Sequence, residues 1–163
     1  MQFACFSNFS SNTLVVDGTS YPTVEHFFQA SKFAAGDAHR NKILAAATPA
    51  VAKKLGKTKK ISKDEWYARR NNVMETAIRA KFEQNDAARA CLLGTGEREL
   101  VEHTARDKYW GDGGGTGRGQ NMLGKILMKV RGELAEKGTK KGDDVKKKHR
   151  ATTKEVSVGI KKS

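Results

Sequence analysis

The sequence YPTVEHFFQASKF, residues 21–33, decides how the chain begins to fold and where a site can form. Pro22 followed by Thr23 predicts the start of a helix, because proline disfavours an earlier start and the threonine hydroxyl can cap the first turn. Glu25 then lies in that first turn, where the helix dipole favours a carboxylate. We therefore expect a helix that begins directly after Thr23.

One face of this expected helix carries an unusual set of polar side chains. Glu25, Gln29 and Lys32 have the spacing of a single helix face, together with the ring of Phe28. Burying a carboxylate, an amide and an amine is costly unless these groups are paired or contact something polar. This face is therefore the first candidate for a binding site.

The residues before the helix predict a short β-hairpin. Residues 14–16 are strand-like, the Asp-Gly pair at 17–18 is a hairpin turn signal, and residues 19–21 supply the returning strand. The hairpin leads directly into the helix. We therefore expect the polar segment Ser7–Phe9 to lie within reach of Glu25.

The middle and the end of the chain predict further helices. The longest is expected over about residues 63–84, and its apolar stripe at helical spacing is core, with Trp66 the one position held open for a site. The candidate N-caps of the later helices are Asp37, Thr48, Ser62, Asp86 and Asn121. The sum is a mainly α fold, which is α+β only through the small N-terminal hairpin.

The charge of the chain divides into a body and a tail. Residues 137–163 hold 10 Lys or Arg and 3 Asp or Glu, a net charge of +7, which leaves +6 of the formal +13 for residues 1–136. The tail has no periodicity, so we expect residues 1–136 to form one domain and residues 137–163 to be disordered. A basic balance favours phosphate-bearing partners, or merely keeps the protein soluble.

Several classes of protein are disfavoured by what the sequence lacks. Cys5 and Cys91 do not form a disulfide framework or a paired-cysteine zinc pattern. The four histidines have no metal-ligand spacing, so we expect no catalytic metal and no cofactor. Without a visible signal peptide or a bilayer-spanning apolar run, we expect an intracellular protein of the cytoplasm or nucleus with no membrane partner.

The second candidate region is the glycine-rich segment before the last expected helix. Six glycines lie between Gly111 and Gly119, and Asn121 follows them. Glycine-rich backbone that leads into a helix N-terminus can bind an anion, and Tyr109 and Trp110 beside it can stack on a base. The segment lacks the usual nucleotide-binding signatures. A flexible surface loop is the alternative, as is core packing for Tyr109.

Asp107 adds a second carboxylate to these two regions, although a lone aspartate is more often a solvated charge or a cap. Together with Glu25 and Lys32 across a pocket, it can cleave a glycosidic bond. One carboxylate then stabilises an oxocarbenium ion or orients water, and another group protonates or steadies the leaving base. Alternatively, Lys32 attacks a sugar carbon opened to its aldehyde and forms a Schiff base. The residues leave both routes open.

Several blocks of the chain together resemble the NADAR family, also called YbiA-like. They are the segments 6–9, 21–33, 79–85 and 100–104, and the positions Asp107, Tyr109–Gly113, Gly119, Asn121 and Leu123–Gly124. The similarity runs in order from about residue 6 to about residue 136 and leaves out the tail. It implies a compact, mainly α-helical fold and an N-glycosidase that works without a metal.

The resemblance also implies substrates and site residues. The two substrate groups are ADP-ribose attached to guanine bases of nucleic acid and phosphorylated intermediates of the early riboflavin pathway. Glu25, Asp107 and Lys32 match the acidic positions and the lysine of the family. The matching positions for ring stacking and for binding ribose or phosphate are Trp66, Trp110, Asn8 and Asn121. The glycine-heavy residues 113–117 depart from the family pattern, which leaves the phosphate contacts open.

We therefore expect a hydrolase that removes ADP-ribose from modified guanine in nucleic acid, with Glu25, Lys32 and Asp107 acting at the ribose C1. The alternatives are an N-glycosidase for riboflavin intermediates, a non-catalytic module that binds ADP-ribose or NAD, and a simple helical nucleic-acid binder. We expect the basic tail to hold nucleic acid. The expected substrate-binding residues are Ser7, Asn8, Phe9, Gln29, Trp66, Tyr109, Trp110, Gly111, Gly119 and Asn121.

Overall fold

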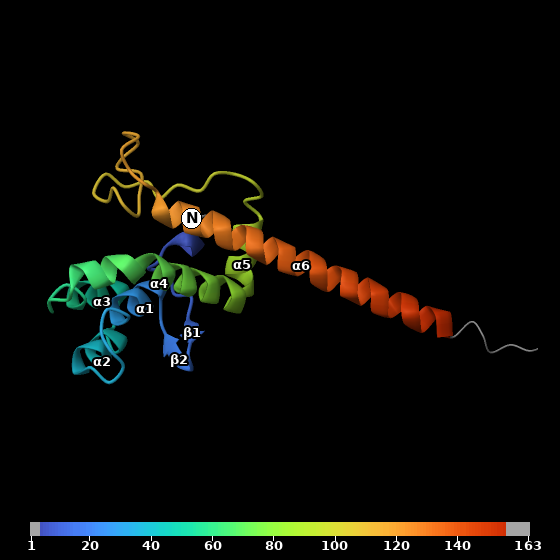
Figure 1. The fold of residues 1–163 in the computed structure, drawn as a ribbon, viewed down its shortest axis with the longest axis horizontal. Helices are drawn as coiled ribbons and strands as arrows, with labels where there is room; N and C mark the ends of the chain where they lie inside the picture. Colours follow the sequence, from blue (N-terminus) through green and yellow to red (C-terminus); the bar gives the residue numbers. More distant parts are fainter. Residues whose placement is uncertain (1–3, 156–163) are drawn as a thin grey trace, which may run out of the picture.

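A computed structural model describes the backbone of residues 4–155 and the side chains of residues 4–138. The elements in chain order are η1 (Ala4–Phe6), β1 (Leu14–Val16), β2 (Thr19–Tyr21), α1 (Val24–Ala30), α2 (Ala38–Leu44), α3 (Pro49–Leu55), α4 (Lys63–Gln84), α5 (Asp86–Leu93) and α6 (Met122–Glu155) (Figure 1). The described chain is mainly helical with one two-stranded antiparallel sheet, which confirms the predicted fold class.

Side-chain caps start the first four α-helices where the sequence predicted them. Thr23, Asp37, Thr48 and Ser62 each accept a hydrogen bond from a backbone N–H in the following turn. These bonds satisfy donors that a helix N-terminus otherwise leaves unpaired. The local pattern of a short polar residue before a helical run is therefore enough to place these helices.

Two other predicted caps do not act through their side chains as expected. Asp86 is the first residue of α5, and the cap position belongs to Asn85. Asn121 precedes α6 with a φ of 48°, and its side chain bonds to the backbone of the preceding loop, at Leu100 and Glu102. Its side-chain amide therefore fixes the loop.

The hairpin is closed by the predicted turn and tied to α4. Asp17 and Gly18 have φ values of 49° and 74°, the left-handed backbone that a tight two-residue hairpin turn requires. The side chain of Gln84, the last residue of α4, accepts from the N–H of Val15 at 2.7 Å and donates to its carbonyl at 2.8 Å. The hairpin thus leads into α1 from a fixed position.

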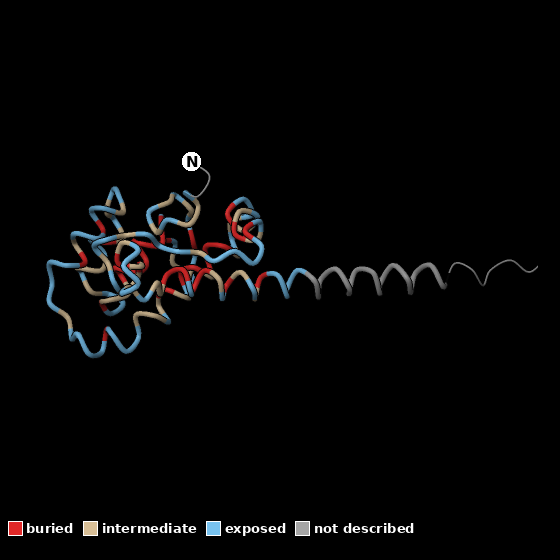
Figure 2. The backbone as a smooth tube through the Cα atoms, turned by 90° about the horizontal axis from the view of Figure 1, so that it is seen from above, coloured by how far each residue is buried: buried red, intermediate tan, exposed pale blue. Residues whose placement is uncertain are grey.

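The core forms around α1 and α4. Helix α1 packs against α2, α3 and α4, and α4 runs beside α6 (Figure 1). Figure 2 shows that buried residues gather where these helices meet. The His26 ring lies within hydrogen-bond distance of Thr23 Oγ1 at 2.8 Å and of the Ala46 carbonyl at 3.0 Å, and it is buried. His26 therefore ties α1 to the segment that follows α2.

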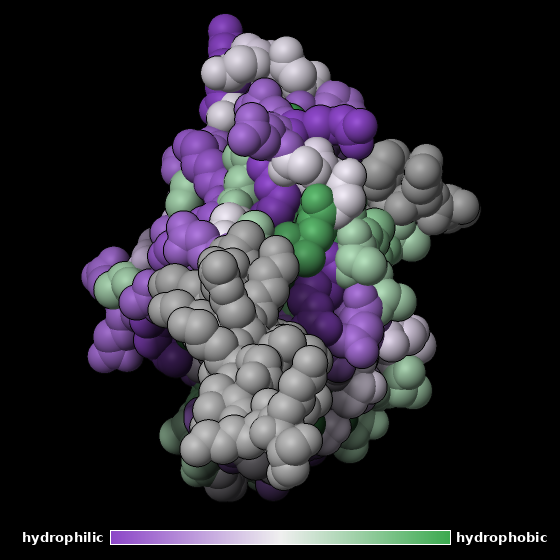
Figure 3. Space-filling model, turned by 90° about the vertical axis from the view of Figure 1, so that its right-hand side faces the viewer, coloured by the Kyte–Doolittle hydropathy of each residue, from purple (hydrophilic) through white to green (hydrophobic). Residues whose placement is uncertain are grey.

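Helix α6 continues further than the sequence predicted. We expected a disordered chain from residue 137, whereas the described helix runs to Glu155, and residues 156–163 lie outside the described residues. A helix already formed on the domain is extended at little cost by the many lysines of this stretch, because lysine is a good helix former. Seen along α6, the described surface is largely hydrophilic with scattered apolar residues (Figure 3). In the described part of the chain, no helix is both long and apolar enough to cross a membrane.

Candidate functional site

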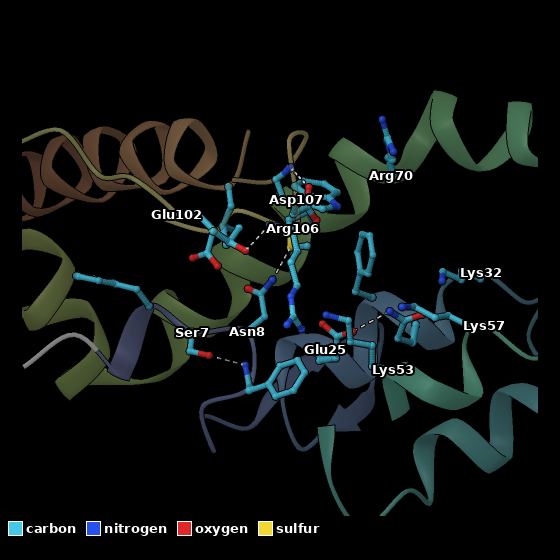
Figure 4. A pocket seen from close by; sticks show the side chains of 18 of the residues that line it. Ser7, Asn8, Glu25, Lys32, Lys53, Lys57, Arg70, Glu102, Arg106 and Asp107 are labelled. Carbon is cyan, nitrogen blue, oxygen red and sulfur yellow. Dashed lines mark hydrogen bonds between the residues drawn. The ribbon is translucent and has the colours of Figure 1, made fainter. Parts of the chain in front are cut away.

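A cavity of about 930 Å³ lies between the N-terminal segment, α1, α3, α4 and the loop that precedes α6. This volume suits a nucleotide-sized ligand. The three residues predicted to be catalytic, Glu25, Lys32 and Asp107, all line it. So do six of the predicted substrate-binding residues, namely Ser7, Asn8, Phe9, Gln29, Trp66 and Trp110. Figure 4 shows how the labelled side chains surround the space.

Glu25 is a buried carboxylate in this cavity, with 5% of its surface exposed. One of its oxygens accepts a hydrogen bond from the amide of Gln29, one turn later, at 2.7 Å. Burial raises the pKa of Glu25, and the hydrogen bond from Gln29 and the charges of Lys53 and Lys32 oppose that rise. The carboxylate is thus fixed in position by the face of α1 that the sequence singled out.

Lys32 lies just beyond the end of α1 and lines the same cavity. Its ammonium donates to the Gly56 carbonyl at 3.0 Å and lies 5.7 Å from the centre of the Trp66 ring. Burial lowers the pKa of Lys32, whereas the charge of Glu25 opposes that change. A lowered pKa increases the fraction of neutral amine, which is the nucleophilic form. The catalytic roles of Glu25 and Lys32 stay predictions.

Gly56 has a positioning function that its backbone angles do not reveal. Its φ of −62° suits any residue, but an added Cβ would overlap the side-chain amide of Gln29. The same residue accepts the hydrogen bond of Lys32 through its carbonyl. Gly56 therefore keeps Gln29 against Glu25 and Lys32 in the cavity.

Asp107 lines the cavity but is partly engaged elsewhere. One oxygen of its carboxylate accepts from the backbone N–H of Tyr109 at 2.9 Å and of Trp110 at 2.8 Å. Aspartate commonly closes a turn in this way. The carboxylate therefore holds the turn that places the Trp110 ring.

Glu102 is a cavity residue that the sequence reading did not single out. Its backbone N–H donates to Asn121 Oδ1, and its carbonyl accepts from the N–H of Asp112, both at 3.0 Å. Burial raises the pKa of Glu102, and the nearby charges of Asp107 and Asp112 raise it further. The residue lies in the block 100–104 that carried the family resemblance, and that block was the available signal.

Four cations that we also did not predict line the cavity, namely Lys53, Lys57, Arg70 and Arg106. Figure 4 shows Lys32, Lys53 and Lys57 grouped at one side, while Glu102, Ser7 and Asn8 lie at the other. On their own elements these residues have the pattern of a solvated face. Lys53 and Arg70 reach the site because α3 and α4 pack against α1, whereas Lys57 comes from the connector after α3 and Arg106 from the loop before α6.

Three aromatic rings meet at the wall of the cavity. Phe28 makes edge-to-face contacts with Trp66 at 5.0 Å and with Trp110 at 5.5 Å, measured between ring centres. Such contacts favour one fixed arrangement of the rings. The predicted stacking residues therefore lie together on the wall formed by α1, α4 and the loop before α6.

The segment Ser7–Phe9 is fixed from below by a buried lysine. Lys81 is fully buried and donates to the Ser7 carbonyl at 2.9 Å and to Ser10 Oγ at 2.7 Å. The Asn8 carbonyl accepts from the N–H of Glu25 at 3.0 Å, while the Asn8 side-chain oxygen, buried at the cavity, has no hydrogen-bond partner among the described residues. That oxygen is available to a ligand donor.

The glycine-rich segment does not line this cavity, contrary to our expectation, and neither do Tyr109, Gly111, Gly119 and Asn121. The loop instead folds around Asp112, whose carboxylate accepts from the N–H groups of Thr104 and Gly114. A hydrogen bond from His103 and these backbone bonds lower the pKa of Asp112 to about 2. Bare glycines are needed because a Cβ at Gly111 or Gly119 would overlap neighbouring loop backbone.

Tyr109 has another function in the structure. Its hydroxyl donates to Asn71 at 2.7 Å, and its ring carries the guanidinium of Arg70 at 3.4 Å from the ring centre. The ring therefore supports Arg70 from outside the cavity.

Comparison with known proteins shows the family of the chain. The NADAR domain model matches residues 1–135. The chain belongs to the NADAR family. It is 46% identical over 131 residues to the N-glycosidase YbiA of Escherichia coli K12, which covers 80% of the chain and 81% of that protein.

Two further similarities inform the choice of function. The solution structure of E. coli YbiA matches with a TM-score of 0.73 and 44% identity, over 83% of this chain and 80% of that one. The chain is also 42% identical over 132 residues to the riboflavin biosynthesis protein VVA0006 of Vibrio vulnificus, covering 80% of the chain and 35% of that protein.

Proposed function

We propose that the chain is an N-glycosidase that hydrolyses the bond between ribose C1 and an amino nitrogen in a phosphorylated substrate. The observation that carries this proposal is the buried Glu25 carboxylate, held by Gln29 in the same cavity as Lys32. The relatives named N-glycosidases support it. A buried acid beside an amine in a nucleotide-sized cavity suits the chemistry of a sugar bond.

The cavity offers a group for each step of this hydrolysis. The charge of Glu25 stabilises the positive charge that develops at C1, and Glu25 accepts the proton of the attacking water. The C1–N bond breaks, and the leaving nitrogen keeps the electron pair and takes a proton. Because burial and nearby acids raise its pKa, Glu102 is suited to donate that proton. Throughout these steps, Asp107 holds the turn that carries Trp110 at the cavity wall.

The second route runs through Lys32. Its amine attacks the C1 of a ring-opened ribose and displaces the base, and water then hydrolyses the resulting imine. The lowered pKa of Lys32 supports this route. Borohydride reduction during turnover distinguishes the two, since it links the sugar covalently to the wild-type protein only if the imine forms. The Lys32→Ala variant must then remain unlabelled.

We propose ADP-ribose on guanine bases of nucleic acid as the substrate. The cavity volume of about 930 Å³ is at the upper end for small-molecule sites. The four cations that line it besides Lys32 supply positive charge for more than one phosphate. A phosphorylated riboflavin intermediate is the second candidate, because relatives named riboflavin biosynthesis proteins match over the same domain.

The test is to incubate guanine-ADP-ribosylated oligonucleotide and, separately, a phosphorylated riboflavin intermediate with wild type and with Glu25→Ala. We expect wild type to release ADP-ribose from the first substrate and Glu25→Ala to release none, as followed by mass spectrometry. Release from the second substrate alone would replace our choice of substrate. Release from neither would overturn the N-glycosidase proposal.

A further inference from the structure

The positive charge of the domain is concentrated in one stretch, residues 53–70, which we name the basic edge. It comprises the end of α3, the connector and the start of α4, and it holds eight Lys or Arg and two Asp or Glu, a net charge of +6. The other residues of the range 1–136 hold thirteen basic and thirteen acidic residues, with no net charge. The whole +6 of the domain therefore comes from the basic edge.

These cations are accessible and mostly not neutralised. Lys54, Lys60, Lys63 and Arg69 are exposed. Within the part of the chain that the structure describes, Lys59 is the one member of the basic edge in an ion pair, with Asp37. An array of exposed, unpaired cations binds a polyanion by releasing its condensed counterions. The basic edge is therefore suited to a repeated phosphate backbone.

The basic edge is continuous with the cavity and carries an aromatic ring. Lys53, Lys57 and Arg70 belong to it and also line the cavity, where Figure 4 shows them. Tyr67 is 53% exposed, and the guanidinium of Arg70 lies 4.3 Å from the centre of its ring. An exposed aromatic among cations is the usual platform on which an unpaired base stacks.

We propose that the basic edge binds the sugar-phosphate backbone of a single-stranded nucleic acid whose modified nucleotide enters the cavity. Tyr67 stacks on a flanking base, and the exposed lysines contact successive phosphates. A single strand fits because a base can enter a pocket only when it is unpaired and unstacked. The inference rests on the proposed function, since it names the polymer that carries the substrate. It places docking on residues 53–70 and not on the tail.

The test measures binding of an unmodified, fluorescently labelled single-stranded DNA of about 16 nucleotides, by anisotropy, between about 50 and 200 mM salt. The full chain is compared with an edge variant, Lys54→Gln, Lys60→Gln and Lys63→Gln, none of which lines the cavity. The matched control is Lys42→Gln, Lys108→Gln and Lys125→Gln, three exposed lysines outside the basic edge with the same change of charge. Circular dichroism checks that all variants are folded.

We expect the edge variant to lose about tenfold or more in affinity, and its salt slope to fall by about 2, while the control stays near wild type. Tyr67→Ala should weaken binding about fivefold or more, and Tyr67→Phe should restore it. No binding by wild type, equal losses in both triple variants, or loss only on removing residues 137–163 would each overturn the proposal. So would stronger edge dependence for phosphatidylserine vesicles than for DNA. Because no turnover is measured, failure of the glycosidase assay leaves this test unaffected.

Discussion

At the scale of single residues, the proposed chemistry depends on where Glu25 is held and on the groups that hold it. The sequence predicted the face that carries Glu25, Gln29 and Lys32 because helical spacing is a local property. It could not show that Gly56, far along the chain, keeps Gln29 in place. That relation exists only after α3 has packed against α1.

Replacement of Glu25 by glutamine should abolish catalysis and leave the fold intact. We expect kcat to fall about 100-fold or more, because the amide can neither accept the water proton nor stabilise charge at C1. The melting temperature should stay the same or rise, since the buried charge costs stability. Glu97→Gln, an exposed carboxylate outside the cavity, is the matched control. Unchanged kcat in Glu25→Gln would contradict this role.

Gly56→Ala should reduce activity through Gln29 and Lys32 without unfolding the protein. The added methyl group displaces the Gln29 amide from Glu25, so we expect kcat to fall by about tenfold, about 1.4 kcal/mol in barrier height. Gly132→Ala in α6 meets no atom within 4 Å and serves as the control. Steady-state kinetics and thermal melts separate the two effects. Equal kcat values in the two variants would show that Gly56 does not position Gln29.

At the scale of elements, the sequence predicted features that depend on local patterns, but not those that depend on long-range contacts. The caps at Thr23, Asp37, Thr48 and Ser62 each act within one turn, so the sequence displays them directly. The loop before α6 was expected to line the cavity with its glycines, and they do not line it. Its order comes from the hydrogen bonds of Asp112 and Glu102, which leave no periodic pattern in the sequence. The cations of α3 and α4 were missed because a solvated face and a cavity wall have the same sequence pattern.

The buried amine of Lys81, which donates to the Ser7 carbonyl, should make the stability of the protein depend on pH. Desolvation lowers the pKa of Lys81 from 10.5 to about 8. The unfolded chain therefore binds more protons between pH 8 and 10.5, and stability contributed by Lys81 rises with pH across that window. Urea unfolding should show wild type gaining stability relative to Lys81→Met from pH 8 to 10.5. Parallel pH curves for the two proteins would contradict the assigned environment.

At the scale of the whole molecule, the described core ends well before the chain does. Leu134 is the last residue of the described hydrophobic core, the family match ends at residue 135, and Lys137 pairs with Glu83 at 2.5 Å. We propose that residues 1–136 are the folding unit. On this proposal, the rest of α6 lengthens the helix but contributes little to the free energy of unfolding of the domain.

Truncation after residue 138 should therefore leave the domain folded. We expect a melting temperature within about 2 °C of the full chain, which corresponds to less than about 1 kcal/mol in a domain of this size. Differential scanning calorimetry of both proteins measures it. A truncated chain that is unfolded, or that melts far lower, would place the distal part of α6 within the folding unit.

The most direct test of the central claim is a crystal structure of the protein with ADP-ribose bound. We predict that ribose C1 lies within about 3.5 Å of the Glu25 carboxylate or the Lys32 amine, a near-attack distance. We also predict that the diphosphate contacts cations from the set Lys53, Lys57, Arg70 and Arg106. A ligand whose C1 faces the glycine-rich loop, or which binds outside this cavity, would contradict the account.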